Sequence, residues 1–222
     1  MEIDDLFSEI YGYEDVKELF TLSLKSKKPI HILMKGPPAS GKTLFMLALE
    51  RLPLKVKYYL GGQTSKAGLT EILLREKPDI LLIDEIDKMN GKDYDSLLSV
   101  METGRVVRCK YHLWAEEQLN MKVYGACNTT NGIPQELLSR FLLIEFKPYS
   151  RQEFIDTSKH ILKHREELTE QEAEMIAQLL ADSTRDVRDA IKLARLYKAG
   201  GDPIKLAKLF FRKKNTTQKT LL

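Results

Sequence analysis

The sequence has few cysteines, no long apolar run and no large excess of charge of one sign. Its 222 residues include two cysteines, Cys109 and Cys127, which excludes a disulfide framework or a cysteine-rich zinc site and favours a cytoplasmic protein. Four scattered histidines form no metal-ligand pattern. No apolar run approaches the roughly 20 residues of a membrane-spanning helix, and the acidic start, MEIDDLFSEI, is not typical of a secretory signal. We therefore expect no membrane partner.

The formal net charge of +3 is unevenly distributed. Six basic residues and no acidic ones follow Pro203, namely Lys205, Lys208, Arg212, Lys213, Lys214 and Lys219. Without them, acidic residues slightly outnumber basic ones, so the bulk charge does not indicate nucleic-acid binding. Any contact with DNA must therefore be local.

Short apolar runs alternate with amphipathic segments up to residue 148. The runs cover 30–34, 56–60, 80–83, 123–127 and 142–146. The helical patterns cover 5–27 with a break at Gly12, 42–51, 66–76, 93–103 and 134–139. Strands of a parallel sheet are apolar on both faces because helices cover both. The pattern predicts a three-layer α/β domain with a five-stranded parallel sheet over 1–148.

The character of the sequence changes after Pro148, because 151–165, 169–182 and 186–198 are typical of three helices without intervening strands. Ser150 and Thr169 are candidate N-caps, and Glu172 completes a capping box with Thr169. Gly200 and Gly201 end the last helix. We predict a small all-α domain over 149–201, followed by a basic helix or tail over 202–222.

Residues 36–43, GPPASGKT, match the phosphate-binding pattern G-x-x-x-x-G-K-[ST], between an expected strand and an expected helix. In such a loop, backbone N–H groups at a helix N-terminus surround the phosphates. Lys42 is expected to contact the β- and γ-phosphates, and the Thr43 hydroxyl to ligate Mg²⁺. The candidate nucleotide-binding residues are Pro38, Ala39, Ser40, Gly41, Lys42, Thr43 and Leu44.

Two acidic residues, Asp84 and Glu85, follow the apolar run at 80–83. A buried strand would place them at its carboxyl end, where ligands of open α/β sheets bind. We predict that Asp84 holds Mg²⁺ and that Glu85 orients and polarises the attacking water. Two such acids can also be the solvated start of a loop, but the phosphate-binding loop upstream favours the catalytic interpretation.

Five motifs occur in the order found in AAA+ ATPases: GPPASGKT, LLIDEIDKM, YGACNTT, LLSRF and DVRDAIKLA. The chain resembles that family from about residue 6 to 198. The resemblance implies ATP hydrolysis with Mg²⁺, an α/β core with a helical lid, and assembly into a homo-oligomeric ring, expected to be a hexamer.

The resemblance also implies roles for individual residues. Asn128 is similar to the sensor-1 residue, which helps to place the water. Arg140 resembles the arginine finger, which acts on the nucleotide of a neighbouring subunit. Arg188 resembles the sensor-2 arginine, with Arg185 as a rival. Three further residues lie where the family contacts adenine: Ile10, Tyr11 and Gly12.

Residues 104–122 form an additional segment before the sensor-1 strand, and their alternation predicts a β-hairpin. A hairpin at this point is found in RuvB-type branch-migration motors, minichromosome-maintenance helicases and MoxR-type chaperones. The flanking stretches METGRV and CNTTNGIPQELLSRF are most similar to the RuvB type. That similarity ends after the lid, since too few residues follow for the winged-helix domain of the RuvB type.

The hairpin sequence leaves two functions open. It combines cations with aromatics, namely Arg105, Arg108, Lys110, Tyr111, His112 and Trp114, which can stack bases or contact phosphates. In the other interpretation, the tryptophan packs at the hairpin base and the charges are solvated. The hypotheses are a DNA-associated motor and a chaperone-like ATPase that remodels protein partners. The intact set Lys42, Asp84, Glu85 and Arg140 argues against an inactive scaffold.

Overall fold

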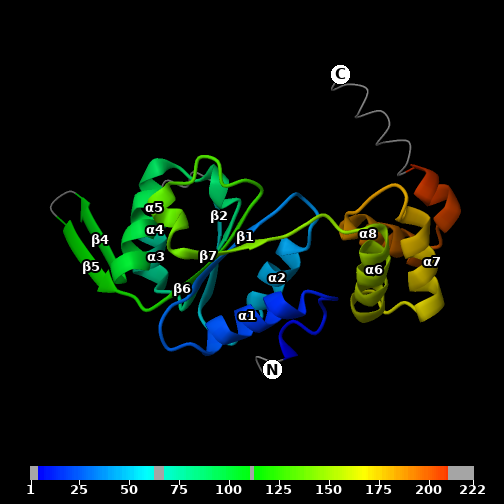
Figure 1. Ribbon diagram of the computed structural model, residues 1–222, viewed down its shortest axis with the longest axis horizontal. Coiled ribbons are helices and arrows are strands. Elements are labelled where there is room, and N and C mark those ends of the chain that lie inside the picture. The colour runs from blue at the N-terminus through cyan, green and yellow to red at the C-terminus, as the bar shows by residue number, and fades with distance from the viewer. Residues whose placement is uncertain (1–4, 63–67, 111–112, 210–222) are drawn as a thin grey trace, which may run out of the picture. The chain divides into compact units, whose positions relative to one another are not determined.

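The computed structural model describes residues 5–62, 68–110 and 113–209, and these form two compact units (Figure 1). The sheet unit contains 5–7, 14–37 and the described residues of 41–146. The helical unit contains 147–209 together with Ser8–Tyr13 and Pro38–Ser40. These two short segments therefore group differently from the predicted division at residue 148. Local contacts explain this: the Tyr13 hydroxyl donates to the Ser40 carbonyl (2.9 Å), and Glu9 pairs with Arg165 (3.0 Å).

The sheet unit contains a five-stranded parallel sheet in the order β2-β3-β6-β1-β7, which confirms the predicted fold class. The strands are β1 (His31–Lys35), β2 (Val56–Leu60), β3 (Ile80–Asp84), β6 (Lys122–Cys127) and β7 (Phe141–Glu145). The three central strands are almost completely buried, whereas the edge strands β2 and β7 are partly exposed. This difference follows from their positions, because only the central strands have a neighbour on each side.

Helices cover both faces of the sheet (Figure 1). They are α1 (Glu14–Lys25), α2 (Lys42–Leu49), α3 (Gly68–Glu76), α4 (Gly91–Thr103) and the short α5 (Gln135–Leu138). On one face, Phe20 of α1 packs against Phe45 of α2 and Tyr124 of β6. On the other face, Val123, which precedes Tyr124 in β6, lies in a buried cluster with residues of α3, α4 and α5. The alternation of neighbouring strand residues thus supplies both cores.

Helix α1 begins at Glu14, shortly after Gly12, where the sequence pattern predicts a break. Gly12 and Tyr13 adopt left-handed backbone angles, with φ of 70° and 59°. Such angles cannot continue a right-handed helix. The apolar residues before them, Leu6 and Phe7, are nevertheless buried, which explains why the periodicity extends beyond the helix.

The predicted hairpin is confirmed between α4 and β6. Strands β4 (Arg105–Lys110) and β5 (Leu113–Gln118) pair antiparallel, with Val107 opposite Glu116. Gly104 ends α4 with a φ of 72°, and a Cβ there would lie 2.5 Å from the carbonyl oxygen of Leu119. Only glycine fits this turn, because both the angle and the space exclude a side chain.

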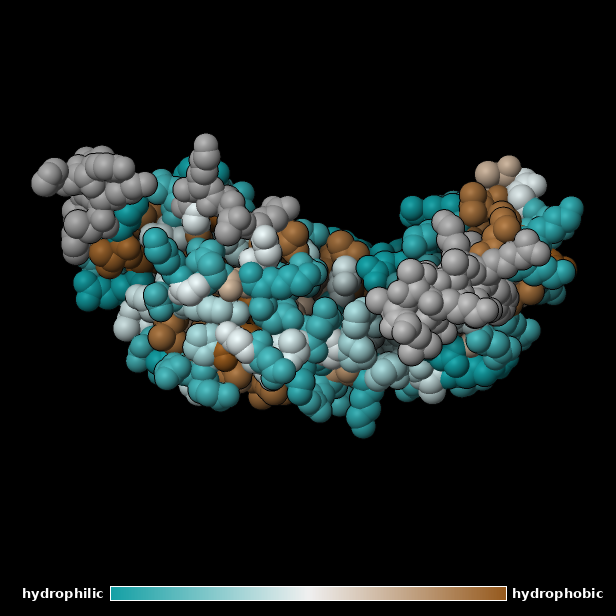
Figure 2. Space-filling model, turned by 90° about the horizontal axis from the view of Figure 1, so that it is seen from above, coloured by the Kyte–Doolittle hydropathy of each residue, from teal (hydrophilic) through white to brown (hydrophobic). Residues whose placement is uncertain are grey.

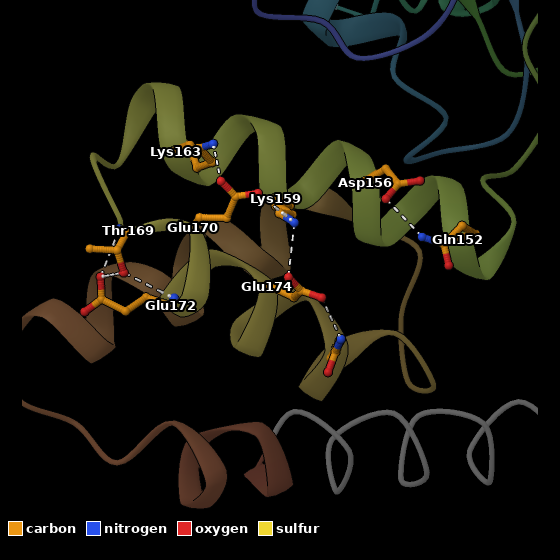
Figure 3. A network of polar contacts seen from close by, with 9 residues as sticks. Gln152, Asp156, Lys159, Lys163, Thr169, Glu170, Glu172 and Glu174 are labelled. Carbon is orange, nitrogen blue, oxygen red and sulfur yellow. Dashed lines mark hydrogen bonds and ion pairs between the residues drawn. The ribbon is translucent and has the colours of Figure 1, made fainter.

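The helical unit contains α6 (Arg151–Arg165), α7 (Glu170–Leu180) and α8 (Val187–Lys198). Ser150 and Thr169 each form a complete capping box, with Glu153 and Glu172 respectively, so the predicted caps are confirmed. Ion pairs connect α6 to α7, as Figure 3 shows: Lys159 lies 3.1 Å from both Glu170 and Glu174.

Hydrophilic residues predominate on the face of the molecule shown in Figure 2, and hydrophobic residues appear there in small, separate groups. Among the described helices, none is long and apolar enough to cross a membrane.

Candidate nucleotide-binding site

The phosphate-binding loop begins where β1 ends, and its first residue is closely enclosed. The Gly36 N–H donates to the Cys127 carbonyl (3.2 Å), and a Cβ on Gly36 would lie 2.4 Å from the Phe146 carbonyl oxygen. The loop ends at Gly41, which has a φ of 94° and is the N-cap of α2 without a side-chain cap. The first N–H groups of α2 therefore do not donate to an N-cap side chain. Such N–H groups at a helix N-terminus can bind an anion.

The structure brings Lys42 and Asn128 together. Lys42 is 8% exposed. Its Nζ donates to the carbonyl oxygens of Gly36 (2.7 Å) and Pro37 (2.8 Å) and lies 3.5 Å from Asn128 Oδ1. All three acceptors are uncharged. The predicted phosphate-binding lysine and the predicted sensor-1 asparagine thus lie next to each other, near the carboxyl ends of β1 and β6.

Asp84 ends β3 with both carboxylate oxygens engaged. Oδ1 accepts from the Glu85 N–H (2.9 Å), and Oδ2 accepts from the Tyr58 hydroxyl (2.8 Å). Burial and the neighbouring Asp84 raise the pKa of Tyr58, so the phenol remains a donor at neutral pH. Tyr58 is absent from the candidates that the sequence provides. It lies 26 residues before Asp84, and only strand pairing brings the two together.

Glu85 has a left-handed backbone, with a φ of 53°, directly after the strand. Its Oε1 pairs with Lys88 Nζ at 2.6 Å, and this hydrogen bond raises the pKa of Lys88. The backbone of Gly61 also lies against Glu85, since a Cβ on Gly61 would be 2.2 Å from the Glu85 carbonyl oxygen. The structure thus adds Lys88 and Gly61 to the surroundings of the predicted base.

The oxygen donors at this edge fit Mg²⁺. This hard cation prefers oxygen ligands and is commonly held by one or two protein groups together with substrate phosphates and water. Thr43 lies exposed in the first turn of α2, and each Asp84 oxygen accepts one hydrogen bond from the described residues. No group of three or more His, Cys, Asp or Glu side chains that could hold a metal occurs in the described part of the chain.

Arg140 lies between α5 and β7, on the surface of the sheet unit. Its guanidinium pairs with Glu102 of α4 at 3.0 Å and donates to the Glu136 carbonyl. Among the described residues its partners are these and Ser139, and none of them belongs to the phosphate-binding loop. The structure therefore does not bring Arg140 to the nucleotide site of its own chain.

The remaining predicted residues belong to the helical unit. Arg188 pairs with Asp186, the N-cap of α8, at 3.0 Å, whereas Arg185 donates to the carbonyl groups of Ala181 and Thr184. Ile10 is buried, Tyr11 is exposed and Gly12 has a positive φ. Pro38, Ala39 and Ser40 group with this unit as well. Adenine contact and the sensor-2 role stay predictions.

The hairpin arginines are paired with carboxylates of their own chain. Arg105 pairs with Glu116 on the opposite strand, and Arg108 pairs with Glu71 of α3. Contact of these cations with phosphates stays a prediction, and it would require each arginine to exchange its acidic partner. Four further predicted positions cannot be assessed: Tyr111 and His112, together with the side chains of Lys110 and Trp114, lie outside the described part.

Comparisons with known proteins agree with this geometry. Residues 32–149 match the family model described as "ATPase family associated with various cellular activities (AAA)". The Holliday junction branch migration complex subunit RuvB of Mycoplasma pneumoniae is 29% identical over 221 residues, covering 92% of this chain and 71% of that protein. The minichromosome maintenance protein MCM of Saccharolobus solfataricus is 28% identical over 182 residues, covering 64% of this chain. This chain spans 26% of that protein.

A solved structure of a RuvB point mutant from Thermotoga maritima is similar in fold. The TM-score is 0.64 at 22% identity, over 90% of this chain and 69% of that one.

Proposed function

The chain belongs to the ATPase family associated with various cellular activities, and from this premise we propose that it is a motor that hydrolyses ATP with Mg²⁺ in a hexameric ring and acts on DNA. The observation that carries the ATPase role is the meeting of Lys42 with Asn128, 3.5 Å apart, at the carboxyl edge of the sheet where Asp84 and Glu85 also lie. Asp84 ends β3, Glu85 and Asn128 directly follow β3 and β6, and Lys42 begins α2 after the loop that follows β1.

Each residue has a role that its surroundings support. Lys42 exchanges its carbonyl acceptors for the β- and γ-phosphate oxygens, which are stronger acceptors because they are charged. Thr43 and Asp84 hold Mg²⁺, which when bound neutralises charge that develops on the phosphates. Glu85 orients the attacking water and accepts its proton. Its pair with Lys88 is exposed, and such pairs contribute little free energy, so Glu85 can exchange this partner for water.

The surroundings of Arg140 support the ring. An arginine finger must act on the nucleotide of a neighbouring subunit, and Arg140 contacts α4 and α5 rather than its own phosphate-binding loop. We expect that mixing Lys42→Ala subunits with Arg140→Ala subunits restores part of the ATPase activity. An Arg140→Ala subunit then holds ATP, and the Lys42→Ala neighbour supplies the arginine.

The matched control mixes Lys42→Ala with Glu85→Gln subunits. Both changes lie in the site that holds the nucleotide, so no mixed interface is complete and activity stays low. Absence of recovery in the first mixture at every ratio, in rings shown to be mixed, would contradict the proposed finger.

Support for action on DNA comes from the similarity to RuvB and to the minichromosome maintenance protein. The ion pairs of Arg105 and Arg108 favour the second candidate, a chaperone-like remodeller of proteins, because they leave less free positive charge on the hairpin. The ATPase rate with and without single-stranded, duplex and junction DNA separates the two. Stimulation of several fold by one form supports the motor. No stimulation by DNA, combined with stimulation by a protein, supports the remodeller.

The hairpin can be tested with opposite changes to one ion pair. If Arg108 contacts phosphate, Glu71→Gln releases it, strengthens DNA binding and makes the salt dependence steeper, whereas Arg108→Ala does the reverse by roughly one unit of slope. Equal affinities of both variants, with the fold intact, would favour the remodeller. The comparison is repeated on a chain that ends at Asp202, because the following segment is basic.

A further inference from the structure

Tyr58 lies on the edge strand β2, outside every motif that the sequence analysis identifies. β2 pairs in parallel with β3, and Leu60 lies opposite Asp84. Tyr58 is two residues before Leu60, and its side chain projects to the same face because strand residues alternate. Two residues span roughly 6.6 Å along a strand, a length that a tyrosine side chain covers. The ring therefore extends along β3 and places its hydroxyl 2.8 Å from Asp84 Oδ2.

The carboxylate of Asp84 is fixed by two donors of different kinds. The Glu85 N–H, which donates to Oδ1, is backbone and moves with the strand end. The Tyr58 hydroxyl, which donates to Oδ2, is the only side-chain donor to Asp84 among the described residues. Together they set the plane of the carboxylate and leave each oxygen with a lone pair to offer. Without Tyr58, rotation about the last side-chain bond would be limited by one donor alone.

We infer that Tyr58 is a positioning residue for Mg²⁺, which acts by orienting the carboxylate of Asp84 toward the ion. This inference rests on the proposed ATPase function and deepens it. Ligating carboxylates are commonly held by hydrogen bonds from outer residues, and loss of such a partner typically lowers metal affinity about 10–100-fold. Tyr58 is 44% exposed and is not among the largest core residues, so its hydroxyl can be removed without a cavity.

The neighbouring residue supplies a matched control. Tyr59 also donates a hydroxyl hydrogen bond to an aspartate at 2.8 Å, but that aspartate, Asp93, is buried and caps local structure at α3 and α4. Tyr58→Phe and Tyr59→Phe therefore delete the same atom and the same type of hydrogen bond one residue apart. Only the first deletion touches the proposed metal ligand.

The experiment titrates Mg²⁺ against a fluorescent ATP analogue bound to the full chain and repeats the titration with Mn²⁺ by electron paramagnetic resonance. For Tyr58→Phe we expect the Mg²⁺ concentration at half-saturation to rise about tenfold, with unchanged nucleotide affinity in EDTA and wild-type turnover at saturating Mg²⁺. For Tyr59→Phe we expect a lower unfolding midpoint and the wild-type Mg²⁺ midpoint.

Two results would overturn the inference while leaving the ATPase proposal intact. One is a wild-type Mg²⁺ midpoint in Tyr58→Phe. The other is a loss of turnover that persists at saturating Mg²⁺. Failure of the proposed function itself looks different, because the wild-type chain would then bind the nucleotide with no dependence on Mg²⁺, or Asp84→Asn would leave that dependence unchanged. Either finding would overturn both.

Discussion

The carboxyl edge of the sheet and the α6–α7 face of the helical unit use charged side chains in opposite ways. At the sheet edge, the buried Lys42 donates to two backbone carbonyl groups and an amide oxygen, and Asp84 accepts from a phenol and a backbone N–H. On the α6–α7 face, surface cations meet carboxylates directly, as the partly buried Lys159 and the exposed Lys163 do with Glu170 (Figure 3).

The two regions differ in the groups that contact their charged side chains. Ion pairs between α6 and α7 neutralise each other and hold two helices together, and each exposed pair contributes up to about 1 kcal/mol. At the sheet edge, uncharged groups hydrogen-bond to Lys42 and Asp84, whereas Glu85 pairs with Lys88. We expect these hydrogen bonds to orient Lys42 and Asp84 toward a third party, which here is the proposed nucleotide and Mg²⁺. Substitutions in the two regions should therefore differ in kind as well as in size.

The largest effect is expected for Lys42→Ala. Removing the buried cation should weaken nucleotide binding by about 2–5 kcal/mol, the cost of truncating one partner of a buried charge pair. At ordinary nucleotide concentrations this abolishes binding, which fluorescence anisotropy with a labelled nucleotide measures. The fold is expected to persist, since the acceptors Gly36 and Pro37 belong to the phosphate-binding loop and to no strand or helix. Binding within a factor of two of wild type would contradict the role of Lys42.

Glu85→Gln should affect turnover and spare binding. The amide keeps the size of the side chain but cannot accept the proton of the attacking water, so hydrolysis should fall about 10²–10⁴-fold. ATP should remain bound and uncleaved, which filter binding followed by chromatography of the nucleotide detects. Lys88→Met is the control, because it removes the partner of Glu85 without removing the base. Wild-type turnover in Glu85→Gln would show that another group acts as the base.

The two units should also differ in how their stability depends on pH. His31 is buried at the start of β1, its Nδ1 accepts from the Val123 N–H (3.0 Å), and burial lowers its pKa to about 4. The unfolded chain takes up a proton near pH 6.5, whereas the folded chain does so only near pH 4. The folded state therefore loses stability as the pH falls through this window, by about 3 kcal/mol in total.

This loss should appear as faster amide exchange in β1 and β6 between pH 6.5 and 5, after correction for intrinsic exchange. His31→Asn keeps an acceptor near the position of Nδ1 and cannot be protonated, so its stability should be nearly flat in that window. The helical unit should weaken only at lower pH, because hydrogen bonds from Lys163 and Arg151 lower the pKa of Glu170 and Asp182. Equal slopes for wild type and His31→Asn would remove His31 as the cause.

The smallest effect is expected for Lys159→Ala. The pairs of Lys159 with Glu170 and Glu174 lie at the surface and are partly exposed, so their loss should lower the free energy of unfolding of the helical unit by about 1 kcal/mol or less. Thr169→Ala, which removes the capping box of α7, the helix that carries both glutamates, should cost about 1 kcal/mol. Urea denaturation followed by circular dichroism compares the two. A larger loss of unfolding free energy for Lys159→Ala than for Thr169→Ala would show that these ion pairs contribute substantially to stability.

The sequence predicts features that depend on neighbours along the chain. Strands β1, β3 and β7 lie within one residue of their predicted positions, and the caps at Ser150 and Thr169 are found as expected. These features follow from periodicity and local hydrogen bonding, which operate within a few residues.

The partners at the site were not predictable in the same way. Tyr58 reaches Asp84 across 26 residues, and Arg108 reaches Glu71 across 37. Both contacts depend on which strand or helix lies alongside, and no local pattern encodes that. Gly61 shows the same limit of prediction. A side chain is excluded there because the Glu85 carbonyl lies beside it, and the local sequence does not reveal that contact. The sequence thus predicts the candidate catalytic and binding groups better than it predicts the residues that position those groups.

The enclosure of Gly36 has a mechanical consequence. Phe146 is the last residue of the sheet unit, its N–H donates to the Lys35 carbonyl (2.7 Å), and its own carbonyl oxygen leaves no room for a Cβ on Gly36. The chain therefore leaves the sheet unit in van der Waals contact with the first residue of the phosphate-binding loop. A displacement of Gly36 toward Phe146 must therefore displace Phe146 as well. Movement of the first loop residue in that direction is thus coupled to the point at which the chain leaves the sheet unit.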